Sequence, residues 1–344
     1  MPGPQPVKNQ EVAVSAKSDG GLLAGTGDGR FADRVFSWAM LGCALCVLAL
    51  LVLIIYELTT KSRLSWHASG IRFFFRSDWD PVNEQFGALP FVFGTIVSSI
   101  LALVLAVPLA VGVAVFITEM CPRGLRVTLA FTTELLAAIP SVIYGVWAMF
   151  VLVPFLREHV EPWLARSFGW TSEFAHKLGV QGPFEGQPFG IGMLAAGIIL
   201  AIMVVPIVSS ITREVMTAVP QQQREAVLAL GATRWEMIRT GVLRNARAGI
   251  FGGVILGLGR ALGETMAVTM VIGNNPQISA SLFAPGYTMA SVIANEFNEA
   301  PGDTYRSALI EIGLALFIVT IIVNILAQLL VWTVTRGTPA RANA

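Results

Sequence analysis

Long apolar runs alternate with shorter polar segments along most of this chain. Six of the runs reach or exceed the roughly 20 residues that a helix needs to cross a hydrocarbon core. We predict membrane spans at residues 35–58, 87–117, 125–155, 189–211, 249–272 and 307–334. The pattern therefore predicts an all-α integral membrane protein with six transmembrane helices.

The polar segments define how the chain is organised. Residues 1–30 are rich in Gly, Pro and polar residues, so we expect a disordered tail there. Residues 31–86 hold the first span and a polar, aromatic outer loop. Residues 87–336 contain spans two to six as one membrane domain, and 337–344 form a second tail.

Composition and charge agree with this class and indicate an orientation. The chain is 54% hydrophobic and 13% charged, and its net charge of +1 gives no indication of nucleic-acid binding. Of 23 lysines and arginines, 14 lie in segments on the same side as both termini and eight in the opposite loops. Because positive loops tend to stay inside the cell, we expect cytoplasmic termini.

A polar, amphipathic segment with six arginines, residues 213–247, separates the fourth and fifth spans. Pro220 can open a helix, and Gly231 is placed to cap the end of that helix. Thr233 and Glu236 have the spacing of a capping box, which would start a second helix. The segment is therefore predicted to form a helix, a sharp turn and a second helix.

Trp235, Met237 and Ile238 fall near this predicted turn. Large apolar side chains on a helix that faces solvent are typical anchors for a partner protein. A helix that lies on anionic lipid head groups fits the same pattern, and spacing alone does not separate the two interpretations.

The fifth span repeats a glycine every four residues, at Gly249, Gly253 and Gly257. Small residues at this spacing let two helix backbones approach closely in lipid. The stripe is compatible with a pore-lining helix at a subunit interface and equally with tight packing alone.

Charged residues lie inside two of the predicted spans. Arg260 would lie about 16 Å along the fifth span, near the middle of a core of about 30 Å, with Glu264 on the same helix face. Glu134 would lie at a similar depth in the third span. A charge at this depth costs at least about 2.5–3.5 kcal/mol on insertion scales. We therefore expect a substrate path, with a buried salt bridge that fixes helix packing as the alternative.

The sequence shows no catalytic or metal-binding arrangement. The motifs GxxxxGK[ST] and HExxH are both absent. Three histidines, His67, His159 and His176, lie in predicted outer loops, and the Cys43/Cys46 pair falls within the first span, where packing explains it. We expect a protein that is not an enzyme and that has no cofactor or metal of its own.

The polar segment resembles the EAA loop of the permease subunits of bacterial ABC importers. Glu225-Ala226-Val227 is followed, after three residues, by Gly231. The chain resembles the PstC family of phosphate-importer permeases more closely, through ELLAAIPSVIYG (134–145), GATRW (231–235), GLGRALGETMAV (257–268) and TMASVIANEF (288–297). The ETMAV ending favours this family over PstA, the partner permease.

This resemblance implies a type I ABC importer permease in the bacterial inner membrane, and phosphate import as its function. It implies a PstA-like second permease, a PstB-like ATPase dimer that binds ATP and Mg²⁺, and a PstS-like extracytoplasmic phosphate-binding protein. The residues implied to couple to the ATPase are Glu225, Ala226, Gly231, Thr233 and Trp235. An importer of another oxyanion, such as sulfate or molybdate, and an ion-coupled secondary transporter or channel remain alternatives.

The charged residues of the fifth span could form hydrogen bonds with phosphate. The planar fork of an arginine offers paired donors to two phosphate oxygens. A carboxylate such as Glu264 only accepts hydrogen bonds, so it favours a phosphate that still carries a proton over sulfate, which has none. The pair is therefore expected to pass hydrogen phosphate and to disfavour sulfate.

Overall fold

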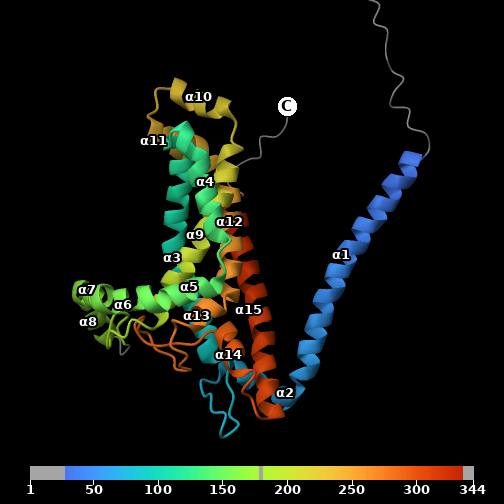
Figure 1. The fold of residues 1–344 in the computed structure, drawn as a ribbon, viewed down its shortest axis with the longest axis vertical. Helices are drawn as coiled ribbons and strands as arrows, with labels where there is room; N and C mark the ends of the chain where they lie inside the picture. The colour runs from blue at the N-terminus through green and yellow to red at the C-terminus, as the bar shows by residue number, and fades with distance from the viewer. Residues whose placement is uncertain (1–27, 178–180, 336–344) are drawn as a thin grey trace, which may run out of the picture. The chain divides into compact units, whose positions relative to one another are not determined.

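A computed structural model describes residues 28–177 and 181–335, and every regular element in those ranges is helical (Figure 1). This confirms the predicted all-α class. The α-helices are α1 Asp28–Lys61, α2 Arg63–Ser69, α3 Leu89–Val115, α4 Arg123–Ala137, α5 Ser141–Trp147, α6 Val153–Phe155, α7 Glu161–Ser167, α8 Gly169–Lys177, α9 Met193–Thr217, α10 Gln221–Ala229, α11 Arg234–Glu236, α12 Arg244–Gly263, α13 Met266–Thr269, α14 Met289–Glu296 and α15 Asp303–Thr335. A 3₁₀ helix covers Gly70–Phe75, and π-helical turns at Phe116–Met120, Ala148–Leu152, Leu156–Val160 and Met237–Leu243 extend or join the α-helices.

The chain divides into two units, residues 1–56 and 57–344. Within the first unit, α1 confirms the first predicted span, because the stretch Phe31–Lys61 reaches a mean hydropathy of 2.8. α1 already begins at Asp28, so the predicted tail of residues 1–30 is slightly too long. The rest of that tail and the predicted tail at 337–344 lie outside the described residues.

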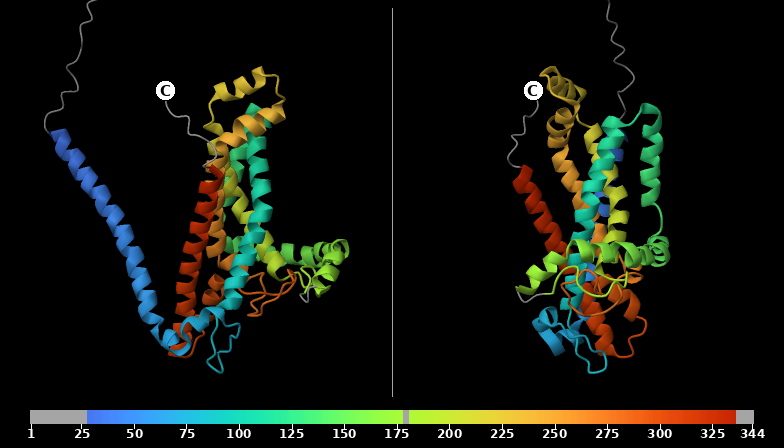
Figure 2. Two further views of the ribbon diagram at one scale, coloured as in Figure 1. Left: turned by 180° about the vertical axis from the view of Figure 1, so that it is seen from behind. Right: turned by 90° about the vertical axis from the view of Figure 1, so that its left-hand side faces the viewer.

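In the second unit, α3 and α9 pack along each other and form the centre (Figures 1 and 2). α3 buries an alanine at every fourth position, which brings the α9 backbone close: Ala102, Ala106, Ala110 and Ala114. On the α9 side, a Cβ added to Gly197 would collide with the side chain of Leu101. These helices correspond to the second and fourth predicted spans, although α9 begins at Met193 rather than at 189.

α12 packs against α9 through the predicted glycine stripe. A Cβ added to each glycine would meet a branched side chain of α9, at 2.5 Å from Val215 for Gly249, 3.1 Å from Ile211 for Gly253 and 2.8 Å from Val204 for Gly257. The stripe therefore packs closely in this structure, and the helix it packs against belongs to the same chain.

Gly257→Leu is expected to lower the free energy of unfolding by about 1–3 kcal/mol, the usual range for an overpacked core. The new side chain must displace Val204 and Val208, which would lie within 3 Å of its Cβ. Gly252→Leu is the matched control, because a Cβ at Gly252 meets no atom within 4 Å. Thermal unfolding of the purified variants in detergent measures the difference, and equal unfolding temperatures would contradict this packing.

The third predicted span, residues 125–155, is wrong as a single helix. α4 ends at Ala137, and the helical run that starts with α5 at Ser141 extends across the axis of α3 and α9, as Figure 2 shows. Pro140 explains the break, because its ring removes a backbone donor and disfavours helical dihedrals at Ile139. Pro140 itself is extended, with a ψ of 139°. Part of the predicted outer loop, residues 156–188, is consequently helical.

Within the described residues, five helices are long and apolar enough to cross a membrane: Phe31–Lys61, Leu89–Met120, Ser141–Ser167, Met193–Thr217 and Asp303–Thr333. The last of these corresponds to the sixth predicted span. The predicted count of six is not reproduced, because α4 has only 15 residues and α12 carries three arginines.

Candidate functional site

α10 lies beyond the ends of α3 and α9, at the top of Figure 1. Pro220 precedes its first turn in an extended conformation, with ψ of 141°. Gly231 follows its last turn with φ of +83° and donates its N–H to the Leu228 carbonyl at 2.9 Å. Because glycine adopts this φ without steric cost, the predicted cap at Gly231 is confirmed.

Thr233 forms the predicted capping box. Its hydroxyl accepts the N–H of Glu236 at 3.3 Å, and the Glu236 carboxylate accepts the N–H of Thr233 at 2.8 Å. The Thr233 backbone and side-chain donors lower the pKa of Glu236, because they stabilise its charged form. From Arg234 the chain stays helical to Gly263, so residues 213–247 form the helix, turn and helix that the sequence predicted.

The tip of this segment exposes large apolar side chains. Trp235 is 62% exposed and Leu230 is 88% exposed. Glu225 and Ala226 of the EAA-like motif are also exposed, on α10 itself. The segment therefore presents polar and apolar groups together at one end of the second unit.

Two of the predicted anchors are not part of this surface. Met237 and Ile238 are buried in a cluster with Met216 and Val219, where they hold the turn onto the ends of the long helices. The prediction that they contact a partner is wrong, because their helical positions point toward the bundle. Leu230, directly before the capping glycine, is an exposed apolar residue that was not among the predicted anchors.

The fifth predicted span, residues 249–272, is helical only as far as Gly263. Glu264 is extended, with a ψ of 128°, and the short α13 follows. The predicted placement of Arg260 and Glu264 on one helix face is therefore wrong. Glycine is a poor helix former, and Gly263 is the last residue of α12.

Arg260 lies in the last turn of α12 and is exposed. Among the described residues it forms no ion pair, neither with Glu264 nor with Glu134. The Tyr144 hydroxyl of α5 donates to the Leu136 carbonyl at 2.8 Å. The structure thus does not show the buried packing bridge that was the alternative, and the guanidinium can meet an anion.

α5 packs against α13, the short helix that follows the break. A Cβ on Gly145 of α5 would lie only 3.0 Å from the Cα of Ala267 in α13. Glu264 is half-buried between α12 and α13, and its Oε1 lies 3.5 Å from the backbone N of Ala267. α5 is therefore packed beside the break at which Glu264 lies.

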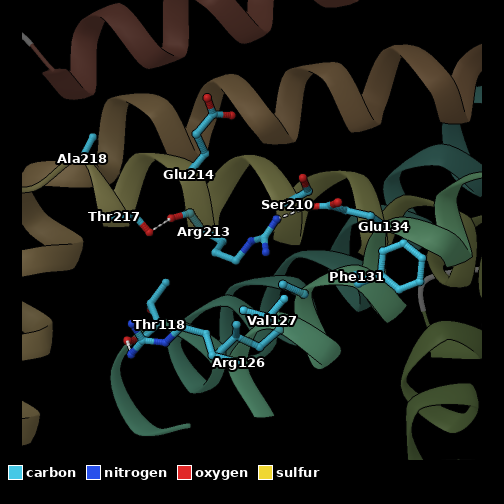
Figure 3. A pocket seen from close by; sticks show the side chains of 12 residues that line it. Thr118, Arg126, Val127, Phe131, Glu134, Ser210, Arg213, Glu214, Thr217 and Ala218 are labelled. Carbon is cyan, nitrogen blue, oxygen red and sulfur yellow. Dashed lines mark hydrogen bonds and ion pairs between the residues drawn. The ribbon is translucent and has the colours of Figure 1, made fainter. Parts of the chain in front are cut away.

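Glu134 belongs to a different place in the structure. It forms an ion pair with Arg213 of α9, as Figure 3 shows. The pair lines a cavity of about 800 Å³ that also includes Arg126, which donates to the Thr118 carbonyl. The structure therefore does not bring Glu134 together with Arg260. The sequence gave no sign that Glu134 pairs with Arg213.

Comparison with known proteins identifies the family. Residues 106–336 match the family described as binding-protein-dependent transport system inner membrane component. The phosphate transport system permease protein PstC of Mesorhizobium japonicum is 45% identical over 314 residues, which are 90% of this chain and 94% of the relative. PstC of Haemophilus influenzae is 45% identical over 288 residues, 84% of this chain and 89% of the relative. The chain belongs to the PstC family.

Membership in the PstC family agrees with the fold. The crystal structure of a bacterial ABC transporter involved in the import of the acidic polysaccharide alginate matches with a TM-score of 0.58 at 15% identity, over 89% of this chain and 99% of that one. The helical fold is thus that of a type I ABC importer permease. PstC relatives are named as transport permeases, so this member is an inner-membrane transport subunit and not an enzyme.

Proposed function

We propose that this chain is a permease subunit of an ATP-driven phosphate importer and forms half of its translocation pore. The observation that carries this proposal is the 45% identity to a phosphate transport permease across 90% of the chain. Arg260 supports it independently. An arginine within a membrane protein's transmembrane region is expensive unless it meets an anion, and no carboxylate pairs with it among the described residues.

Arg260 and Glu264 would act on phosphate in complementary ways. The guanidinium replaces part of the hydration of the ion with paired donors. The Glu264 carboxylate accepts the hydrogen bond of a P–OH group, which sulfate cannot supply. Glu134 would join the same path only after its ion pair with Arg213 opens.

The proposed importer has three kinds of partner. A PstA-like permease completes the pore, a PstB-like ATPase dimer binds ATP and Mg²⁺, and a PstS-like extracytoplasmic protein delivers phosphate. The segment around α10 would dock on the ATPase and transmit its motion through Glu225, Ala226, Gly231, Thr233 and Trp235. The exposed apolar tip of that segment supports this role.

Both termini and residues 213–247 are proposed to face the cytoplasm. A cysteine in place of the exposed Arg234, in a chain without its native cysteines, is expected to react with a membrane-impermeant maleimide in inverted vesicles only. A cysteine at Val82, which is 90% exposed in a predicted outer loop, is the control and should react in intact cells. Labelling of position 234 from outside intact cells would reverse the orientation and remove α10 from any cytoplasmic ATPase.

Purification of the tagged chain from native membranes tests the proposed assembly. An ATP-driven importer predicts that an ATPase and a second permease are recovered with it. An ion-coupled secondary transporter predicts a chain that purifies without an ATPase from membranes that still take up phosphate, and that result would contradict the proposal.

A further inference from the structure

One ion pair joins α10 to the long helices. Arg224 Nη2 lies 3.2 Å from Glu119 Oε1, and the two side chains are only 16% and 11% exposed. Glu119 lies in the π-helical turn that extends α3, and Arg224 directly precedes Glu225 of the EAA-like motif. The pair therefore connects the proposed docking segment to the end of a membrane helix.

The same guanidinium also reaches α9. Arg224 Nη2 donates to the Met216 carbonyl, in the last turn of α9, at 2.7 Å. A single side chain thus holds α10 at the ends of both central helices. Its Nη1 donates to Gln221 Oε1 at 3.4 Å within α10, and its buried Nε has no hydrogen-bond partner among the described residues. Nη2 therefore makes both contacts that reach the central helices.

The other contacts of α10 are with the helix that follows the turn. Gln223 accepts a hydrogen bond from Asn245 of α12 at 2.9 Å, and Val227 packs beside Gly241. Because none of the α10 residues is fully buried, a largely buried, charge-assisted link adds to its attachment. The Arg213–Glu134 pair differs, because its glutamate is 52% exposed and joins α9 to α4 instead.

We infer that Arg224 is a positioning residue that transmits movement of α10 to α3 and α9 through Glu119 and the Met216 carbonyl. This inference rests on the proposed docking of α10 on an ATPase. A docked α10 that lacks this link can still be moved by the ATPase, but the movement is passed on poorly. Loss of Arg224 therefore uncouples ATP hydrolysis from transport and leaves the ATPase bound.

The test compares Arg224→Gln, Glu119→Gln and the exchanged pair Arg224→Glu with Glu119→Arg in the whole importer, reconstituted in liposomes. The readouts are ATPase retention, the ATP hydrolysis rate and phosphate moved per ATP hydrolysed. Each single variant is expected to retain the ATPase and to move at least about fivefold less phosphate per ATP, the lower end of typical coupling between sites. The exchanged pair should recover part of this loss.

Controls separate coupling from folding. Arg123→Gln removes an exposed arginine of α4, outside the docking segment, and should leave phosphate moved per ATP unchanged. Arg224→Lys keeps the charge, so the phosphate that it moves per ATP should lie between the values for wild type and for Arg224→Gln. If the glutamine variant does not assemble, reduced phosphate per ATP in Arg224→Lys still supports the inference, and a wild-type value overturns it. The inference would be overturned if the single variants moved as much phosphate per ATP as the wild type. It would also be overturned if the exchanged pair moved no more phosphate per ATP than either single variant. A wild-type chain that binds no ATPase would instead refute the proposed function.

Discussion

Arg260→Gln is expected to lower phosphate uptake about ten- to hundredfold, as befits a lost hydrogen bond to a charged group, about 1.5–3 kcal/mol. The permease should still insert and keep its ATPase, because Arg260 is exposed and removing it leaves no carboxylate without an ion-pair partner. Uptake of labelled phosphate, together with the amount of ATPase that co-purifies, measures both parts of the result.

Two further variants identify what Arg260 contributes. Arg260→Lys keeps the charge but not the planar fork, so its uptake should be intermediate. The double variant Arg260→Gln with Glu264→Gln should take up no more phosphate than Arg260→Gln alone, because no guanidinium is left to replace phosphate hydration. Recovery of uptake in the double variant would show that the two residues form a packing pair, and the phosphate path would have to lie elsewhere.

Trp235→Ala is expected to weaken binding of the ATPase by at least about 2 kcal/mol, roughly 30-fold, as for a typical interface hot spot. Trp235 is 62% exposed beside the exposed Leu230, and a tryptophan at such a tip has no role in the core of this chain. Retention of the ATPase by the purified permease, as a function of detergent wash or dilution, measures the loss.

Trp163→Ala is the matched control for this variant. Trp163 is 55% exposed and lies on α7, away from the docking segment. It should leave ATPase retention unchanged. Equal retention for Trp235→Ala and Trp163→Ala would mean that the apolar tip does not anchor the ATPase.

Features with local causes could be predicted from the sequence. The capping box at Thr233 depends on residues three positions apart, and the cap at Gly231 depends on the conformational freedom of one glycine. The stripe from Gly249 to Gly257 follows from helical periodicity alone. That its partner is α9, rather than a second subunit, depends on tertiary packing and was open from the sequence.

The helix breaks at Pro140 and Gly263 were not predicted, because apolar residues are frequent on both sides of each break. Hydropathy measures how well a segment suits lipid, and it does not distinguish one spanning helix from two helices at an angle. The break after Gly263 changes the candidate site, because it places Glu264 outside α12 and off the helix face that carries Arg260. The ion-pair partners of Glu134 and Glu119 lie far away in the sequence, so only the fold could reveal them.

The central claim is that this chain carries phosphate inward at the expense of ATP. The most direct measurement is uptake of labelled phosphate by host cells that lack the chain, with and without its restoration, in competition with unlabelled phosphate, sulfate and molybdate. Uptake at low phosphate is expected to fall on deletion and to return with the wild-type chain but not with Arg260→Gln. Among the three unlabelled anions, only phosphate is expected to compete. Unchanged uptake after deletion, or equal competition by sulfate or molybdate, would contradict it.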